Sequence, residues 1–255
     1  MVFQWITTTL FGWITRHFGW AESATPYNVL LVVFAFLCMV IPYLLGSINP
    51  AIVFSKLIYK DDVRTHGSGN AGSTNMLRTY GFKAAALTFV CDMLKAVVAL
   101  LVGALLLGAH GVSIAGFFVM FGHMFPLYYK FKGGKGVACC AAVALMISPQ
   151  TFLCAVAVFI LVLIGSRMVS MASVMAALLY PLFMRAFAPT FPLGVAMAVL
   201  EACFIVFMHR ENLKRIWNYE ERKVDFSKIT DKFKKKKKTE EASADEKEDG
   251  GRGDA

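Results

Sequence analysis

The stretch His66-Gly-Ser-Gly-Asn-Ala-Gly-Ser-Thr-Asn75-Met-Leu-Arg78 is a polar loop that lies between two long apolar segments of the chain. Its glycines let the backbone turn and let a ligand approach the main chain closely. Its serine, threonine and asparagine side chains offer neutral hydrogen-bonding groups, and Arg78 adds a planar fork suited to carboxylate or phosphate. Beside membrane-spanning helices, such a loop is expected to form part of an anion-binding site.

The segments around this loop indicate a membrane protein. Of the 255 residues, 57% are hydrophobic and 17% are charged, and apolar runs of about 20 residues, long enough to cross a bilayer as a helix, recur along the chain. The predicted fold class is an all-α, polytopic integral membrane protein of about seven transmembrane helices. The net charge of +9 would also suit a nucleic-acid partner. None is expected, because the basic residues gather in short loops and a tail, as membrane topology requires.

The expected spans place the polar clusters on one membrane face. Loops 60–83 and 130–136, the turn at Arg167 and the tail are rich in lysine and arginine, which marks their face as cytoplasmic and leaves the N-terminus outside. A five-span alternative treats 137–165 as one span and omits another. The seven expected spans are 29–59 (interrupted at 46–50), 84–107, 114–129, 137–147, 151–165, 171–187 and 191–208.

The two ends of the chain differ in composition from the spans. Residues 1–25 are aromatic and amphipathic, which predicts a helix in the membrane interface. Residues 224–255 contain a lysine run followed by an acidic stretch, which predicts a disordered charged tail with some attraction to anionic lipid. The six cysteines lack metal-ligand spacing. They are expected to be reduced thiols, and neither a metal nor a cofactor is expected.

Two further polar clusters follow the opening loop. Lys130-Phe-Lys-Gly-Gly-Lys-Gly136 precedes an apolar segment, so its glycine amides and lysines could hold a phosphate at a helix N-terminus; a flexible basic turn is an equally good interpretation. His209 and Asn212 share one face of a helix that leaves the membrane. His209 could be a general base, a hydrogen-bond donor to phosphate, or simply an interfacial histidine.

Two other features have simpler interpretations. Asp92 and Lys95 lie three residues apart within a span, so a structural ion pair is favoured over a direct contact with substrate. Ser68 lies in a Gly-Ser-Gly context that is not the nucleophile elbow of acyl-enzyme chemistry, so hydrogen bonding to a ligand is favoured for this residue.

The polar clusters resemble the motifs of a known family. Ser68-Gly-Asn-Ala-Gly-Ser-Thr-Asn-Met-Leu-Arg78, Gly133-Gly-Lys-Gly-Val-Ala138 and His209-Arg-Glu-Asn-Leu-Lys-Arg215 are similar, in order and spacing, to the motifs of the bacterial acyl-phosphate:glycerol-3-phosphate acyltransferases (PlsY type). The resemblance extends from about residue 46 to residue 221. It includes Asp92-x-x-Lys95 and Gly122-His-x-Phe-Pro126.

This resemblance implies a multi-pass enzyme of the bacterial cell (inner) membrane with a cytoplasmic active site and C-terminus. Residues 26–223 would form the acyltransferase domain. The implied reaction moves a fatty acyl group from acyl phosphate to the sn-1 hydroxyl of glycerol 3-phosphate, giving lysophosphatidic acid and phosphate in the first step of phospholipid synthesis. The expected partners are these substrates, membrane lipids and an enzyme that supplies acyl phosphate.

The resemblance and the residue chemistry together predict the site. The expected catalytic residues are Ser68, Arg78, His209 and Asn212, and Asp92, Lys95, Ser170 and Ser173 are further candidates. Residues expected to bind a substrate phosphate are Asn70, Asn75, Lys132, Gly133, Gly134, Lys135 and Gly136.

The chain also departs from the family pattern. Cys139 stands where the family usually has threonine, so a hydroxyl donor is missing there, and Ser73, Ala142 and Tyr219 are further departures. A transporter or binding protein for a phosphorylated small molecule is the competing class. It would need polar groups that reach both membrane faces, and the short, nearly uncharged outer turns disfavour it.

Overall fold

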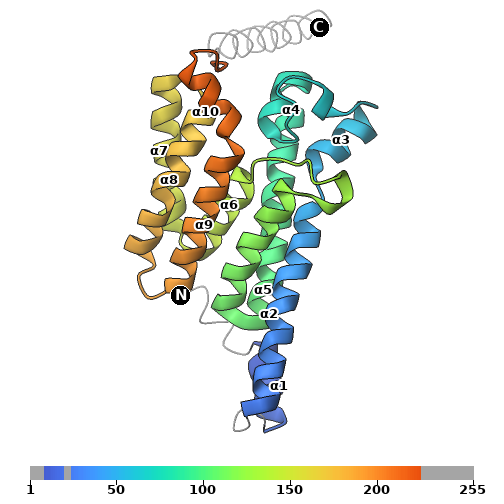
Figure 1. The fold of residues 1–255 in the computed structure, drawn as a ribbon, viewed down its shortest axis with the longest axis vertical. Helices are drawn as coiled ribbons and strands as arrows, with labels where there is room; N and C mark the ends of the chain where they lie inside the picture. The colour runs from blue at the N-terminus through green and yellow to red at the C-terminus, as the bar shows by residue number, and fades with distance from the viewer. Residues whose placement is uncertain (1–8, 20–23, 225–255) are drawn as a thin grey trace, which may run out of the picture.

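The computed structural model describes residues 9–19 and 24–224, and all regular secondary structure within those ranges is helical. This confirms the all-α fold class. The helices α2 (Ala24–Ser47) and α5 (Phe82–Met124) stand beside a group made of α6 (Val137–Ile147), α7 (Pro149–Ser166), α8 (Val169–Phe187) and α9 (Pro192–Met208). The shorter helices α3 (Pro50–Ile58), α4 (Ser73–Tyr80) and α10 (Arg210–Trp217) lie at one end of this bundle, opposite α1 (Leu10–His17) (Figure 1).

The predicted interruption at 46–50 separates α2 from α3. Asn49 adopts an extended conformation, and its side chain accepts a hydrogen bond from the Ile52 amide, which caps α3. Pro50 occupies the first turn of α3, where a missing amide hydrogen costs nothing. The predicted break at Ser148-Pro149 has the same design, because Ser148 accepts from the Thr151 amide and begins α7.

Helix α5 is a hairpin of two antiparallel arms rather than one long rod. Its backbone leaves the helical conformation at Leu107 and Gly108, and Gly108 has a φ of +60°, which favours glycine. A straight helix would separate Asp92 from His123 by about 45 Å, yet the Asp92 Oδ1 and His123 Nδ1 atoms are 3.1 Å apart. The two segments predicted here as separate spans therefore form two separate helical arms, with a tighter turn than the expected 108–113.

Length and composition identify several helices that could cross a membrane. Residues 25–58, 82–129, 149–166 and 169–187 qualify, and α9 qualifies together with α10, to which it is joined at a bend of 56°. Helix α6 has 11 residues and is shorter than an ordinary span. The polytopic membrane class is confirmed, whereas the choice between seven and five crossings stays a prediction.

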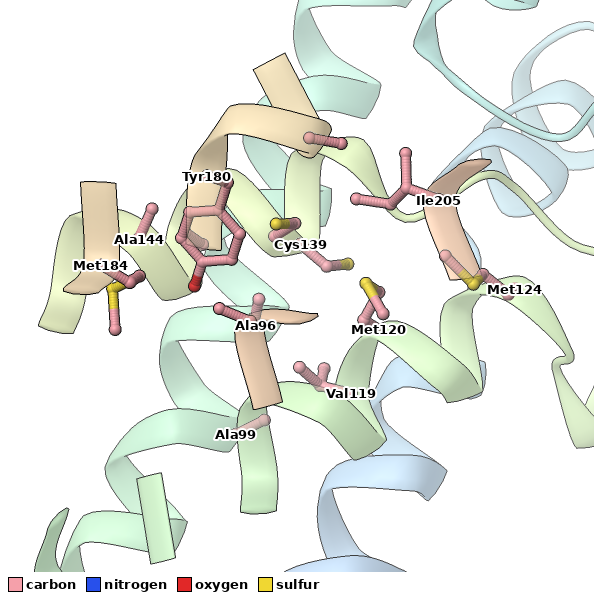
Figure 2. Packing of buried hydrophobic residues seen from close by; sticks show 14 residues of the cluster. Ala96, Ala99, Val119, Met120, Met124, Cys139, Ala144, Tyr180, Met184 and Ile205 are labelled. Atoms are coloured by element: carbon pink, nitrogen blue, oxygen red, sulfur yellow. The ribbon is translucent and has the colours of Figure 1, made fainter. Parts of the chain in front are cut away.

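The largest core cluster lies where α5, α6, α8 and α9 meet. It consists mostly of alanine, methionine and cysteine side chains around the buried ring of Tyr180 (Figure 2). Small residues let membrane helices approach closely, and large apolar side chains such as Val32, Leu94 and Leu161 stay exposed on the outside of the bundle. A surface of this kind suits hydrocarbon rather than water.

The amphipathic N-terminal segment is only partly described. Helix α1 packs Phe11 against Phe34 of α2, with ring centroids 5.8 Å apart. Residues 1–8 of that segment, and the tail from residue 225 onward, lie outside the described residues. Both the interfacial location of 1–25 and the disordered tail stay predictions.

The contact between α2 and α5 gives a test of the fold. A Cβ atom on Gly46 would collide with the backbone carbonyl of Val119, and backbone cannot move aside as a flexible side chain can. We expect Gly46→Val to cost about 1–3 kcal/mol, measured as a fall of several degrees in the apparent Tm of the purified protein. Gly165→Val is the control, since no atom lies near that position. Equal melting of the two variants would contradict this helix contact.

Candidate active site

A cavity of about 210 Å³ lies where the motif loops, α5, α8 and α10 come together. Most of the predicted site residues line it, although they come from distant parts of the sequence. Those residues are Ser68, Asn70, Asn75, Arg78, Asp92, Lys135, Gly136, Ser170, Ser173, His209 and Asn212. Lys95, Lys132, Gly133 and Gly134 were also predicted but lie outside the lining.

Asn75 shapes the first motif loop. Its side-chain nitrogen donates to the carbonyl oxygens of Val63 and His66 at 2.9 and 3.0 Å, and its side-chain oxygen accepts from the Ser68 amide at 2.9 Å. These bonds engage both the oxygen and the nitrogen of the side-chain amide, so Asn75 supports the loop, and a phosphate contact of this residue stays a prediction. Ser68 itself is exposed at the rim, where its hydroxyl can meet a ligand.

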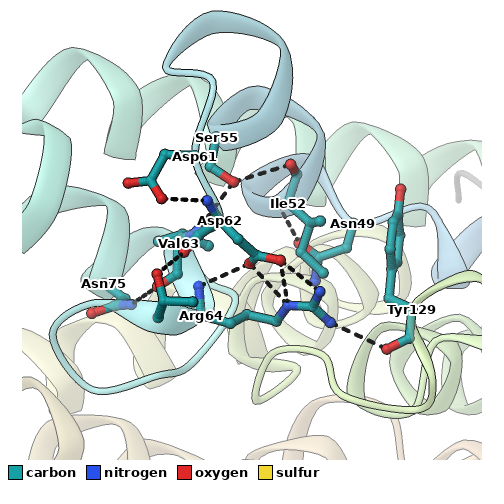
Figure 3. A network of polar contacts seen from close by, with 10 residues as sticks. Asn49, Ile52, Ser55, Asp61, Asp62, Val63, Arg64, Asn75 and Tyr129 are labelled. Carbon is teal, nitrogen blue, oxygen red and sulfur yellow. Dashed lines mark hydrogen bonds and ion pairs between the residues drawn. The ribbon is translucent and has the colours of Figure 1, made fainter.

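A polar network ties the first motif loop to the second (Figure 3). Asp62 pairs with Arg64 at 2.7 Å, and Arg64 donates to the Tyr129 carbonyl at 3.2 Å. The hydrogen bonds from Arg64 lower the pKa of Asp62 to about 2, so this carboxylate stays charged. Asn49 donates to the Ala71 carbonyl at 3.2 Å and secures the loop from the α2–α3 break.

The glycine-rich loop binds its neighbours differently from the sequence-based expectation. The amides of Gly133 and Gly134 donate to the carbonyls of Met124 and His123 at 3.2 and 3.0 Å. These two amides therefore already have backbone partners, and phosphate binding by these glycines stays a prediction. Lys132 is exposed and also lies outside the cavity. The groups of this loop that reach the cavity are Lys135 and the residues that begin α6, whose first amides have no partner within the helix.

A hydrogen-bonded chain joins the second motif to the third. Lys135 donates to the side-chain oxygen of Asn212, and the Asn212 nitrogen donates to Glu221 at 2.8 Å. Ser170 and Arg215 also donate to Glu221, each at 2.8 Å. Burial opposes ionisation of this carboxyl, but the three donors together hold its pKa below the ordinary value. The Glu221 carboxylate therefore accepts hydrogen bonds from three side chains, and these bonds orient Ser170 and Asn212 at the cavity.

His209 sits in the bend between α9 and α10. It is buried, and its Nδ1 lies 2.8 Å from the carbonyl oxygen of Ile205. A carbonyl only accepts hydrogen bonds, so Nδ1 carries the hydrogen and Nε2 keeps its lone pair. The local geometry thus prepares Nε2 to accept a proton or a hydrogen bond.

Asp92 and Lys95 form the predicted ion pair, at 2.8 Å. The Lys95 ammonium also lies 2.9 Å from His123 Nδ1 and donates to the carbonyls of Gly46 and Ile48 at 3.0 and 2.7 Å. Lys95 is therefore a structural cation that joins the end of α2 to both arms of the α5 hairpin.

Asp92, His123 and Cys139 come close enough to resemble a metal-binding group. The ammonium of Lys95 already faces the carboxylate of Asp92 and the ring nitrogen of His123. Cys139 directs its thiol toward the Asp92 carbonyl at 3.8 Å. The departure from threonine at this position thus lies beside the Asp92 cluster.

Some lining residues were not among the predicted site residues. His123 and Glu221 line the cavity, and their signals were the Gly122-His-x-Phe-Pro126 motif and the acidic position that ends the resemblance. Phe89, Phe159 and Val169 add an apolar side to the cavity. In sequence they look like any other residues of an apolar span.

Comparisons with known proteins agree with this geometry. Residues 36–219 match the family described as glycerol-3-phosphate acyltransferase. The chain is 40% identical to the glycerol-3-phosphate acyltransferase of Thermoanaerobacter sp. (strain X514), over 72% of this chain and 92% of the relative. It is 43% identical to that of Geobacillus kaustophilus (strain HTA426), over 74% and 95% of the two chains.

A solved structure is also similar. The crystal structure of PlsY, an integral membrane glycerol 3-phosphate acyltransferase in its glycerol 3-phosphate form, superposes with a TM-score of 0.72 at 33% identity. The match covers 77% of this chain and 98% of that one. The lysophosphatidic acid form of the same enzyme gives a TM-score of 0.69. These similarities support the transferase interpretation rather than the transporter alternative.

The charge state of Lys135 can be tested directly. Burial is the main cause that lowers the pKa of Lys135 to about 8. The charge of Glu221 raises this pKa, and the charges of Arg215 and Arg78 lower it further. We expect amine-reactive labelling of Lys135, followed by mass spectrometry, to rise as the pH passes through about 8, because only the neutral amine reacts. Glu221→Gln removes an attractive charge and should shift this midpoint to lower pH. A Lys135 that stays unlabelled until about pH 10, the ordinary range of lysine, would contradict the buried environment.

Proposed function

This chain belongs to the glycerol-3-phosphate acyltransferase family and is a membrane acyltransferase, and we propose that its acyl donor is acyl phosphate. The acceptor in this proposal is the sn-1 hydroxyl of glycerol 3-phosphate, and the products are lysophosphatidic acid and inorganic phosphate. The observation that carries the proposal is a polar cavity lined by Arg78 and Lys135 that shares Phe89, Val137, Phe159 and Ser173 with an adjoining apolar cavity. Such a pair of cavities suits a donor with a phosphate head and an alkyl chain.

Both proposed substrates are anions, so the site must offset their repulsion. Arg78 can bind a phosphate through two nitrogens, whereas Lys135 acts as a point charge. The amides at the start of α6 add donors and the positive end of a helix dipole. The Ser68 hydroxyl, which is exposed at the rim of the cavity, can donate to a phosphate oxygen, whereas Ser170 already donates its hydroxyl proton to Glu221.

The chemistry asks little of a protein nucleophile. Acyl phosphate is a mixed anhydride, so its phosphate is already a good leaving group. The sn-1 hydroxyl oxygen attacks the carbonyl carbon, the carbon–oxygen bond to phosphate breaks, and the phosphate leaves with the bond electrons. Holding the two reactants together in a site with preorganised charge supplies most of the acceleration in this proposal.

The hydroxyl proton needs an acceptor. His209 Nε2 is one candidate, because the Ile205 carbonyl holds the hydrogen on Nδ1. A phosphate oxygen of a substrate is the other candidate, and Lys135 and Arg78 would then hold that phosphate in place. In this proposal Asn212 and Glu221 position the cations and do not take the proton.

The proposal includes the orientation of the protein in the membrane. The lysine- and arginine-rich loops and the cavity would face the cytoplasm of a bacterium, and the protein would lie in the inner membrane with its N-terminus outside. Glycerol 3-phosphate would then arrive from the cytoplasm, and a separate enzyme would supply acyl phosphate.

A donor assay tests this function. Purified protein with labelled glycerol 3-phosphate should form lysophosphatidic acid from acyl phosphate but not from acyl-CoA in a parallel reaction. Losing the charged hydrogen bonds of Arg78 costs about 1.5–3 kcal/mol, so Arg78→Ala should lower kcat/KM by about 10- to 100-fold. Lys132→Ala is the matched control, because Lys132 is cationic but lies outside the cavity. Product formed only from acyl-CoA would contradict acyl phosphate as the donor. An equal loss of kcat/KM in Arg78→Ala and Lys132→Ala would contradict the proposed role of Arg78.

The role of His209 has its own test. If Nε2 takes the proton, His209→Gln should lower kcat by about 10²- to 10⁴-fold, the usual contribution of general base catalysis. The glutamine amide keeps a polar side chain of similar length but cannot accept the proton. Near-normal turnover of His209→Gln would remove histidine from this role and leave the substrate phosphate as the base.

A further inference from the structure

The adjoining apolar cavity has a volume of about 200 Å³ and a definite direction. Val137 of α6, Phe159 of α7 and Ser173 of α8 line both cavities and therefore mark the mouth of the apolar one. Seven residues along each helix from these positions stand Ala144, Phe152 and Tyr180, which line only the apolar cavity. At 1.5 Å per residue, the cavity extends about 10 Å from its mouth.

The far end of this cavity is closed by the protein core. Tyr180 and Ala144 are each 2% exposed and belong to the largest core cluster. Figure 2 shows the Tyr180 ring beside Ala144 and Met184 of this cluster. A chain that follows the helices inward therefore meets an aromatic ring with packed side chains behind it.

A buried carboxyl group contacts the cavity wall that Cys140 of α6 forms near this closed end. Glu201 of α9 is 1% exposed, and the thiol of Cys140, which lines the cavity, lies 3.7 Å from its Oε2. A carboxyl at such a depth is costly unless neighbours satisfy it. This contact ties the inner wall to α9. The wall made by Phe89, Met93 and Val156 differs, since Phe89 is exposed and Met93 and Val156 are only half-buried.

We propose that Tyr180 ends the acyl-chain cavity and thereby limits the length of the alkyl chain that the enzyme accepts. This inference rests on the proposed function, because the cavity must receive the chain of the donor. The ring acts by its bulk, so its position along α8 sets where further methylene groups stop adding to binding. Each buried methylene group improves binding by roughly fourfold, which makes such a stop measurable.

Three variants change the depth of the cavity in known directions. Tyr180→Leu should deepen it, Ala177→Met should block it one helical turn nearer the mouth, and Tyr180→Phe should leave it unchanged because the ring stays. Ala172→Met is the control, since Ala172 is buried on the same helix but lines neither cavity. Each variant is supplied with one equimolar mixture of acyl phosphates of increasing length. The lysophosphatidic acids formed are measured by mass spectrometry, so that partition into lipid is the same for all.

We expect Tyr180→Leu to shift the product distribution toward longer chains, with up to roughly a 15-fold rise in the preference for two further carbons, since each buried methylene group adds roughly fourfold. Ala177→Met should shift it toward shorter chains, while Tyr180→Phe and Ala172→Met match the wild type. An identical distribution from all active variants would overturn the proposal and indicate that the chain leaves sideways between α5 and α7.

A second measurement separates this inference from the proposed function. Monoalkyl phosphates of the same lengths cannot transfer an acyl group, yet they should stabilise the protein against heat as they bind. The chain length at which this stabilisation stops rising should move in the same directions in the same variants. If the wild type gives no product from any acyl phosphate, the proposed function fails, and this binding series still decides the role of Tyr180. No change in that series would overturn it.

Discussion

An ammonium group shielded from water must find its hydrogen-bond acceptors inside the protein, and Lys95 finds them on three segments. It faces Asp92 on one arm of the α5 hairpin, His123 on the other arm, and two carbonyls at the end of α2. In a hydrocarbon environment each of these groups would be costly alone. The contacts of Lys95 with these groups hold the two arms of the hairpin and the break after α2 together. They also position His123 next to the glycine-rich loop, where its carbonyl accepts from the Gly134 amide.

The rest of the site depends on this arrangement through backbone hydrogen bonds. The carbonyls of His123 and Met124 hold the amides of the glycine-rich loop, so Lys135 points toward Asn212 and Glu221. Many motif residues therefore support one another rather than the ligand. Only a few cations and hydroxyls are left to meet the substrates, and their positions are set in advance. This matches a reaction in which orientation and charge matter more than a strong nucleophile.

Local rules predicted the architecture well. Proline and glycine were enough to predict the breaks at 46–50 and Ser148-Pro149, and the predicted spans placed the three polar clusters on one face. The engagement of the Gly133 and Gly134 amides was beyond such rules, because their partners lie in another helix and backbone carbonyls carry no sequence signal. Sequence could not distinguish Lys132 from Lys135 for the same reason, since the turn decides which of these two lysines lines the cavity. The structural role of Asn75 also needed coordinates.

The wall of the apolar cavity that Phe89 and Met93 of α5 form with Val156 of α7 is partly exposed. This exposure has a consequence for the turnover rate of such an enzyme. A donor that enters from the bilayer would reach the enzyme by two-dimensional diffusion within the membrane. Its polar co-substrate would reach the enzyme by three-dimensional diffusion through water. Turnover would then follow the mole fraction of donor in the lipid and not its bulk concentration. Diluting the membrane with inert lipid would slow the enzyme even when the total amount of donor is unchanged. The turnover rate of such an enzyme would then depend on the lipid composition of the membrane.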